Sequence, residues 1–166
     1  DGAIDPRPLA RLGVPVWTPS NREDWTWPFI GPMDREYAMA ALVGFHSNAG
    51  QRGFRPHTIN DAIRGLSIDG QLVGEVTHLI VGLAAHGVPV VVISGDMNAT
   101  QEAQALVPSV SGATVRFLCE HGSVGFLSSE EAGELLREAA RVAATEDHPL
   151  VDLQLPVRVR LETHSP

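Results

Sequence analysis

Residues 75–96, EVTHLIVGLAAHGVPVVVISGD, decide the fold class because a helix pattern is followed directly by a buried-strand pattern. Gly87 is typical of the position just after a helix, and the run 88–94 is apolar on both of its faces. Four apolar residues recur at helical spacing: Val76, Leu79, Ile80 and Leu83. The stretch therefore predicts a helix over 75–86 and a buried parallel strand over 88–94.

Upstream of this unit, the sequence predicts one more strand and a hairpin. The small and apolar run 38–45 is typical of a buried strand. Residues 63–68 and 71–73 flank Asp69-Gly70, which is the strongest short hairpin signal in the chain. Residues 46–60 are rich in glycine and polar residues, and we expect them to form a loop.

Downstream of the unit, helix and strand patterns continue to alternate. We expect a short helix over 98–106, N-capped by Asn98, and a strand over 113–119. Ser128 and Glu131 have the spacing of a capping box and predict a helix that runs to about residue 144. Residues 156–163 alternate strictly, as in a half-exposed strand at a sheet edge. The fold class is therefore α/β, a mostly parallel sheet with flanking helices.

The first 32 residues differ from the rest of the chain. They carry several prolines and all three tryptophans, Trp17, Trp25 and Trp27, with little periodicity. We expect an extended segment over 1–32, with a short strand at 14–17, followed by one α/β domain over 33–166. Tryptophans in such a segment usually anchor it on a core or a partner chain, so residues 14–30 are the candidate for packing between chains.

Composition excludes several classes of function. A net charge of −8 argues against binding nucleic acid, which needs a basic surface. All 12 basic residues are arginines, so no lysine-dependent phosphate loop, Schiff base or general base comes from this chain. No apolar run is long enough to span a bilayer, and the start lacks a signal-peptide pattern. The single cysteine, Cys119, fits a reducing compartment, so we expect a cytoplasmic protein.

Two histidines and a glutamate are the main candidates for chemistry. His46 follows the predicted strand 38–45, His57 lies in the next loop, and Glu75 opens the helix over 75–86. Imidazole nitrogen and carboxylate oxygen suit Zn²⁺, and sites in α/β folds lie beyond strand ends. The residues alone leave a metal or catalytic site and ordinary surface or core roles about equally open. This set is also too small to hold a catalytic metal by itself.

An ordered set of short segments over 33–163 resembles the C-terminal half of the DppA-type D-aminopeptidase family of zinc peptidases, M55. The helix that begins Ser-Ser-Glu-Glu-Ala at residue 128 is the last of these segments. The others are Gly44-Phe45-His46, Pro56-His57-Thr58, Ile68-Asp69-Gly70, Val73-Gly74-Glu75, Gly87-Val88-Pro89-Val90 and Val92-Ile93-Ser94-Gly95-Asp96. No single segment is specific, but their order and the spacings between His46, His57 and Glu75 agree with the family pattern.

The resemblance implies a pair of zinc ions, short peptide substrates with an unblocked N-terminus, and ring-like homo-oligomers. It places His46 and Glu75 on metal ligands and His57 on the catalytic histidine. We therefore expect a zinc-dependent hydrolase of amide or peptide bonds in small substrates. Four further residues are weaker candidates for contacts with substrate, for the pocket wall or for orienting the site: Asn48, Thr58, Asp96 and His121.

One departure from the family pattern is large. The remaining family ligands lie on an Asp-x-Glu-Gly segment and an Asp-Ser-His-like segment of an N-terminal half, and neither is present in this sequence. Our preferred explanation is a companion N-terminal chain that supplies those ligands and shares the zinc ions. The alternatives are a metal-free, non-catalytic subunit that serves assembly or binding, a truncated chain, and a different site altogether.

Overall fold

A computed structural model describes residues 11–13, 37–152 and 154–164. The chain divides into two units, Asp1–Glu36 and Tyr37–Pro166, and all elements below belong to the second unit. The predicted strand at 14–17 and the tryptophan-bearing segment 14–30 lie outside the described residues. Their expected role in packing between chains therefore stays a prediction.

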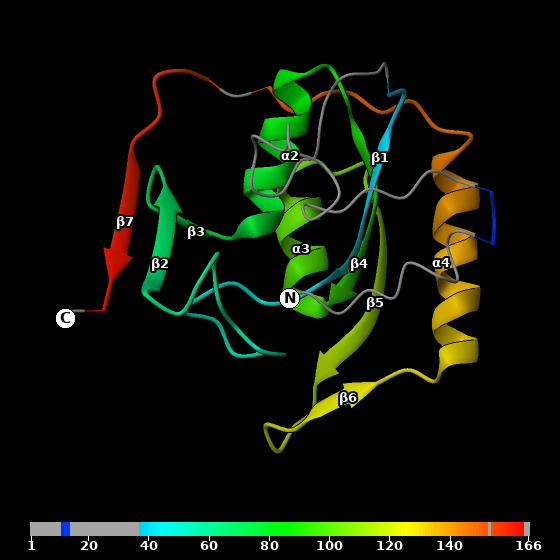
Figure 1. Cartoon of the computed structure of the whole chain (residues 1–166), viewed down its shortest axis with the longest axis horizontal. Coiled ribbons are helices and arrows are strands. Elements are labelled where there is room, and N and C mark those ends of the chain that lie inside the picture. Colours follow the sequence, from blue (N-terminus) through cyan, green and yellow to red (C-terminus); the bar gives the residue numbers. More distant parts are fainter. Residues whose placement is uncertain (1–10, 14–36, 153, 165–166) are drawn as a thin grey trace. The chain divides into compact units, whose positions relative to one another are not determined.

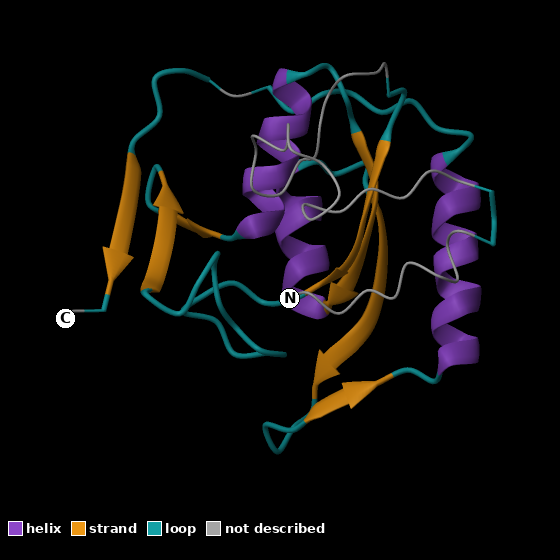
Figure 2. Ribbon diagram, viewed as in Figure 1, coloured by secondary structure: helices purple, strands orange, loops and turns teal. Residues whose placement is uncertain are grey.

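The main sheet has the strand order β1-β4-β5-β6 (Figure 2). Its strands are β1 (Ala40–Phe45), β4 (Val90–Asp96), β5 (Ser111–Leu118) and β6 (Val124–Phe126). Strand β4 pairs in parallel with both β1 and β5, whereas β6 is antiparallel to β5. The predicted mostly parallel α/β fold is confirmed, although the sequence patterns did not indicate β6.

Helices cover both faces of this sheet. Helices α2 (Glu75–Ala85) and α3 (Met97–Leu106) lie on one side, and α4 (Ser129–Ala143) lies on the other (Figure 1). Every residue of β4 is consequently buried, as its apolar run predicted. One core cluster joins strands β4 and β5 to α4 through Val91, Val92, Ala113, Ala139 and Ala143. Each fully buried valine stabilises the fold by about 1.5–3 kcal/mol.

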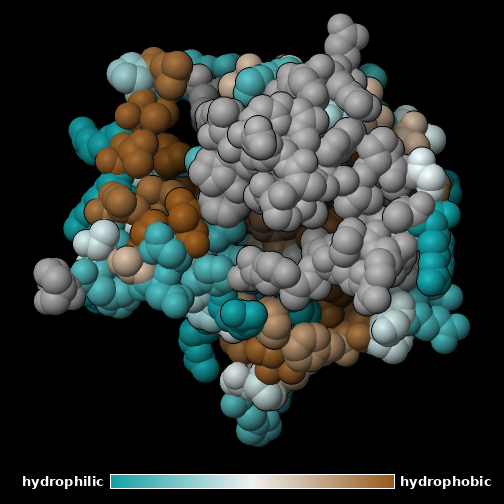
Figure 3. Space-filling view, in the orientation of Figure 1, coloured by the Kyte–Doolittle hydropathy of each residue, from teal (hydrophilic) through white to brown (hydrophobic). Residues whose placement is uncertain are grey.

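A second, antiparallel sheet has the order β3-β2-β7. Its strands are β2 (Ile63–Ile68), β3 (Gln71–Val73) and β7 (Val159–Thr163). The Asp69-Gly70 hairpin is confirmed: both residues have positive φ, 49° and 84°, as a two-residue hairpin turn requires. Apolar residues of β7 remain exposed in this sheet, and apolar surface is visible over the β2 and β7 side in Figure 3.

Three details of the sequence prediction are wrong. In β1 only Leu42 is buried and Val43 is 61% exposed, because within the described residues this strand lies at the sheet edge. Strand β7 lies at a sheet edge as predicted, but it is exposed at all of its positions and not only at alternate ones. Helix α3 is N-capped by Asp96, whose Oδ1 accepts from the N–H of Asn98 at 2.8 Å, and not by Asn98 itself.

The predicted capping box at the start of α4 is confirmed. The Ser128 Oγ accepts from the N–H of Glu131 at 3.2 Å, and Glu131 Oε2 accepts from the Ser128 N–H at 2.9 Å. The Ser128 hydroxyl also donates to this carboxylate at 2.7 Å, so these bonds hold the pKa of Glu131 below its usual range. Local sequence alone therefore fixes where this helix begins.

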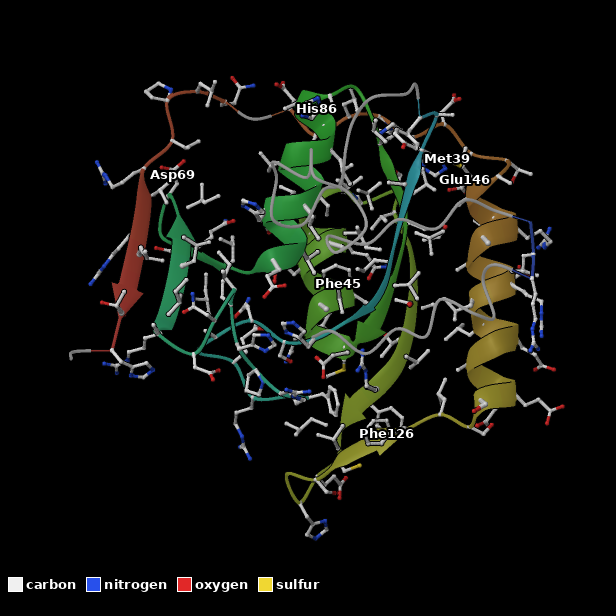
Figure 4. The ribbon with its side chains drawn as sticks, in the orientation of Figure 1. Met39, Phe45, Asp69, His86, Phe126 and Glu146 are labelled. Atoms are coloured by element: carbon white, nitrogen blue, oxygen red, sulfur yellow. The ribbon has the colours of Figure 1, made fainter. Side chains whose placement is uncertain are left out.

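The carboxyl ends of the parallel strands form one edge of the domain. In Figure 4, Phe126 lies near this edge, whereas Met39, at the start of β1, and His86, at the end of α2, lie at the opposite edge. Helix α2 therefore begins on the side where β1 and β4 end. None of the described helices is long and apolar enough to cross a membrane.

Candidate metal centre

Three side chains predicted from the sequence converge beyond the end of β1. His46 directly follows the last residue of β1, His57 lies in the loop between β1 and β2, and Glu75 is the first residue of α2. The Nε2 atoms of His46 and His57 each lie 3.8 Å from Oε1 of Glu75. One ligand atom from each of the three residues lies within 4.8 Å of the others. The fold thus gathers donors from three separate segments.

Backbone carbonyls orient both imidazole rings. His46 Nδ1 lies 3.0 Å from the carbonyl oxygen of Ser47, and His57 Nδ1 lies 2.8 Å from that of Arg55. A carbonyl oxygen only accepts, so this geometry assigns the ring proton to Nδ1 in each histidine. The lone pair of each neutral ring is then on Nε2, the atom nearest Glu75. The two rings also stack, with centroids 3.9 Å apart and planes 16° apart.

The loop that carries His57 is held in a strained conformation on both sides of that residue. Arg55 has φ 44° and Ile59 has φ 64°, a region that a β-branched residue rarely adopts. Both residues serve the cluster through their backbones: the Arg55 carbonyl accepts from His57, and the Ile59 N–H donates to Glu75 Oε1 at 2.7 Å. Strain of this kind typically accumulates at functional sites, and here it orients the donors.

The donor set fits a zinc ion. Imidazole nitrogen and carboxylate oxygen are common zinc ligands, and the cluster brings three such donors together. Metal-binding histidines usually donate their other ring N–H to a carbonyl or carboxylate, as both of these histidines do. The exposed fractions are small, 10% for the His46 side chain, 20% for His57 and 11% for Glu75. The residues therefore offer a partly enclosed, oriented site.

The family model of the D-aminopeptidases, Peptidase_M55, matches residues 27–166. The chain belongs to this family. A D-aminopeptidase of Bacillus subtilis strain 168 is 29% identical over 126 residues, which are 76% of this chain and 46% of that protein. The resemblance seen in the sequence is confirmed, and the chain spans about half the length of this relative.

A solved structure leads to the same family. It is the Zn-dependent D-aminopeptidase DppA from Bacillus subtilis, described as a self-compartmentalizing protease. The match has a TM-score of 0.62 and 29% sequence identity, and it covers 69% of this chain and 43% of that one. The predicted D-aminopeptidase-like fold is thereby confirmed for this M55 chain.

Asp96, a weaker sequence candidate, is the centre of a buried hydrogen-bond network beside the cluster, which we call the Asp96 clamp. It is 1% exposed, and its carboxylate accepts from Ser47 Oγ at 2.6 Å and from the Phe54 N–H at 3.0 Å. Asn98 Nδ2 completes the network by donating to Ser47 Oγ at 2.9 Å. Asp96 therefore ties the end of β4 to the segments that carry His46 and His57 in this M55 chain.

The other weaker candidates divide into two groups. Thr58 is fully buried, and its hydroxyl accepts from the Ala49 N–H at 3.0 Å, which joins the two loop segments. Asn48 is 2% exposed and bonds to Glu102 of α3. His121 is exposed in the turn between β5 and β6 and is not one of the converging donors. Its predicted place in the pocket wall has no support in this geometry.

Arg116 is a neighbour of the cluster that the sequence patterns did not indicate. This β5 residue donates through Nη2 to the carbonyl oxygens of Gly44 at 2.6 Å and Phe45 at 2.8 Å, just before His46. Its guanidinium lies 4.6 Å from the ring centroid of Phe54. Burial lowers the pKa of Arg116, while the charge of Asp96 acts in the opposite direction. Long-range contacts of this kind leave no local sequence signal.

We expect that Gly53→Ala destabilises the protein by about 1–3 kcal/mol, because an added Cβ would overlap Ser47 Oγ within the Asp96 clamp. Gly133→Ala in α4 is the matched control, since its Cβ would meet only the end of the Arg137 side chain, at 3.5 Å. Alanine in that helix should stabilise by about 0.5–1 kcal/mol. Chemical denaturation of the two variants measures both effects. Equal free energies of unfolding would contradict the prediction that the Asp96 clamp has no room for a side chain at residue 53.

Proposed function

We propose that this M55 chain is part of a zinc-dependent hydrolase that cuts amide or peptide bonds in small substrates, in the manner of an aminopeptidase. The observation that carries the proposal is the convergence of two oriented imidazole Nε2 atoms and one carboxylate within 4.8 Å. Relatives described as D-aminopeptidases, one of them Zn-dependent, support the reaction class. The presence of all three donors also favours an enzyme over a metal-free assembly subunit.

In this proposal His46 and Glu75 hold zinc, and His57 is the reactive histidine. Zinc held there would supply a Lewis acid for the scissile carbonyl and for an attacking water molecule. His57 Nε2 accepts a proton from the attacking group and returns it to the leaving amine nitrogen, while Nδ1 stays bonded to the Arg55 carbonyl. The Ile59 N–H donates to Glu75 Oε1 and fixes that carboxylate for binding.

The remaining metal ligands belong, in the same proposal, to a companion N-terminal chain. This chain spans 46% of the Bacillus subtilis D-aminopeptidase, and the cluster offers only three donors among the described residues. A second zinc ion needs further carboxylates or histidines, which that companion would supply. Because the DppA relative is described as self-compartmentalizing, we also expect a higher oligomer.

The test is a joint measurement of metal, mass and activity on the purified protein. We expect at least about one zinc per chain, a second and shorter polypeptide in the intact-mass spectrum, and cleavage of short peptides with a free amine. Removing zinc with a chelator should abolish cleavage, and adding zinc should restore it.

Pairs of D- and L-dipeptides and their N-acetylated forms define the substrate class. Cleavage of free but not acetylated peptides is expected of an aminopeptidase. Less than about one zinc per chain, together with no second polypeptide, would contradict the proposal of a two-chain enzyme.

A further inference from the structure

Glu102 of α3 serves as the N-terminal cap of a different helix, α2. The N-cap residue of α2 is Gly74, which has no side chain to bond to the first turn. Glu102 Oε1 takes that role by accepting from the Gly74 N–H at 2.7 Å, the Thr77 N–H at 3.0 Å and the Thr77 hydroxyl at 2.7 Å. A carboxylate is favourable at a helix N-terminus, so Glu102 fixes the turn that begins with Glu75.

The other carboxylate oxygen of Glu102 holds the segment that carries His46. Oε2 accepts from Asn48 Nδ2 at 3.0 Å, and Asn48 is almost fully buried two residues after His46. Gly74 lies directly against this segment, since a Cβ on Gly74 would lie 2.5 Å from the Asn48 Cβ. The two chain segments that present His46 and Glu75 therefore meet at one carboxylate.

We propose that Glu102 is a positioning residue for the metal centre: it sets the separation of the His46 and Glu75 donors by bonding both segments that carry them. This inference rests on the proposed function, because it assumes that His46 and Glu75 bind the metal. Glu102 does not touch the metal donors, so its effect passes through Asn48 and the first turn of α2. Residues that bond directly to a metal ligand typically change metal affinity by about 10–100-fold when they are removed, and Glu102, which acts one step further out, should reach the lower end of that range.

The orientation of Asn48 gives the inference a sharp test. Its Nδ2 must face the carboxylate, which leaves Asn48 Oδ1 buried without a hydrogen-bond partner among the described residues. In Glu102→Gln, Oε1 still accepts from Gly74 and Thr77. The glutamine Nε2 can donate to Asn48 Oδ1 once the side-chain amide of Asn48 rotates by a half-turn. The glutamine variant therefore removes the charge and keeps the connection between the two segments.

Glu102→Ala breaks the connection completely. Glu102 lines a cavity of about 530 Å³, so its removal enlarges a space that already exists and leaves no sealed void. Gln101→Ala provides the matched control, because Gln101 is exposed, precedes Glu102 on α3 and lines the same cavity. The comparison of the three variants separates the effect of losing the hydrogen bonds of Glu102 from the effect of losing its charge and from the effect of a changed cavity wall.

The experiment has three measurements. Competition with a chromophoric chelator gives the zinc affinity, the visible spectrum of the Co²⁺-substituted protein reports the geometry of the ligands, and the melting temperature of the metal-free protein reports its stability. We expect zinc binding about 10-fold weaker and a changed Co²⁺ spectrum in Glu102→Ala, the lower end of the range for residues that bond a ligand directly. Glu102→Gln should bind zinc within a few-fold of the parent protein and keep its spectrum, and Gln101→Ala should match the parent in both. Unchanged zinc affinity and spectrum in Glu102→Ala, even with a lower melting temperature, would overturn the inference. An equal loss of zinc affinity in Glu102→Gln would also overturn it.

A parent protein that binds no zinc would instead refute the proposed function. The structural part of the inference, that Glu102 sets the separation of the His46 and Glu75 side chains, is then tested by comparing crystal structures of the parent and Glu102→Ala. An altered distance between His46 Nε2 and Glu75 Oε1 supports it, and an unchanged 3.8 Å separation overturns it.

Discussion

Replacing Glu75 with alanine should abolish zinc binding while the domain remains folded. Glu75 supplies the only carboxylate among the three converging donors, and its Oε1 lies 3.8 Å from Nε2 of both histidines. Removing a direct ligand should weaken zinc binding by more than about 100-fold. This exceeds the loss that is typical when a residue bonded to a ligand is removed. Equilibrium dialysis followed by elemental analysis measures the loss.

Two further variants isolate the cause of this loss. Glu130→Ala also removes an acidic residue from the first turn of a helix, here α4. Glu130 is not one of the converging donors, so this variant should leave zinc binding unchanged. Glu75→Gln keeps an oxygen that accepts from the Ile59 N–H, so it should preserve the loop and still bind zinc more weakly than the parent. Full zinc binding by Glu75→Ala would remove this residue from the metal centre.

Replacing His57 with alanine should have the second large effect, on turnover and not on metal. A histidine that moves a proton in the transition state contributes about 10²–10⁴-fold to the rate. We expect a loss of that size in kcat for peptide cleavage, with zinc content largely retained, because His46 and Glu75 remain. Steady-state kinetics and elemental analysis on the same preparation test both parts of the expectation.

His121→Ala is the comparison for this experiment, since His121 is exposed in the turn between β5 and β6. It should leave turnover within a few-fold of the parent protein. If His57→Ala loses zinc as completely as Glu75→Ala, then His57 is a third ligand and the reactive group must be sought elsewhere. The 3.8 Å distance from His57 Nε2 to Glu75 Oε1 makes that outcome a clear alternative.

Local patterns predicted the elements of this fold well and their surroundings less well. The Asp69-Gly70 turn and the Ser128–Glu131 capping box depend on residues within a few positions, and both form as expected. The exposure of Val43 depends on what pairs with β1, and that is decided by distant parts of the chain. The same reason explains why the second sheet, with strands from residues 63 to 163, was not predicted as a separate unit.

The candidate site was predictable where its chemistry is written in residue type. His46, His57 and Glu75 were identified from their positions beside predicted strands and a helix, and the structure brings them together. Glu102 and Arg116 were missed because each acts on segments more than 20 residues away, through contacts with backbone atoms or with an amide. Asp96 was noticed for its position after a strand, yet its bonds to Ser47 and Phe54 required the folded chain.

The connection between β3 and α2 has a consequence for how this domain tolerates insertions. Only Gly74 separates Val73, the last residue of the hairpin, from Glu75, the first residue of the helix. One extra residue at this junction would either displace Gly74 and break its bond to Glu102, or turn the whole of α2 by about 100° out of its core packing and carry Glu75 away from the histidines. An extra residue at the Asp69-Gly70 tip lengthens an exposed turn and puts at risk only the two hydrogen bonds between Asp69 and Arg158. Changes in chain length are therefore tolerable at one end of β3 and disabling at the other.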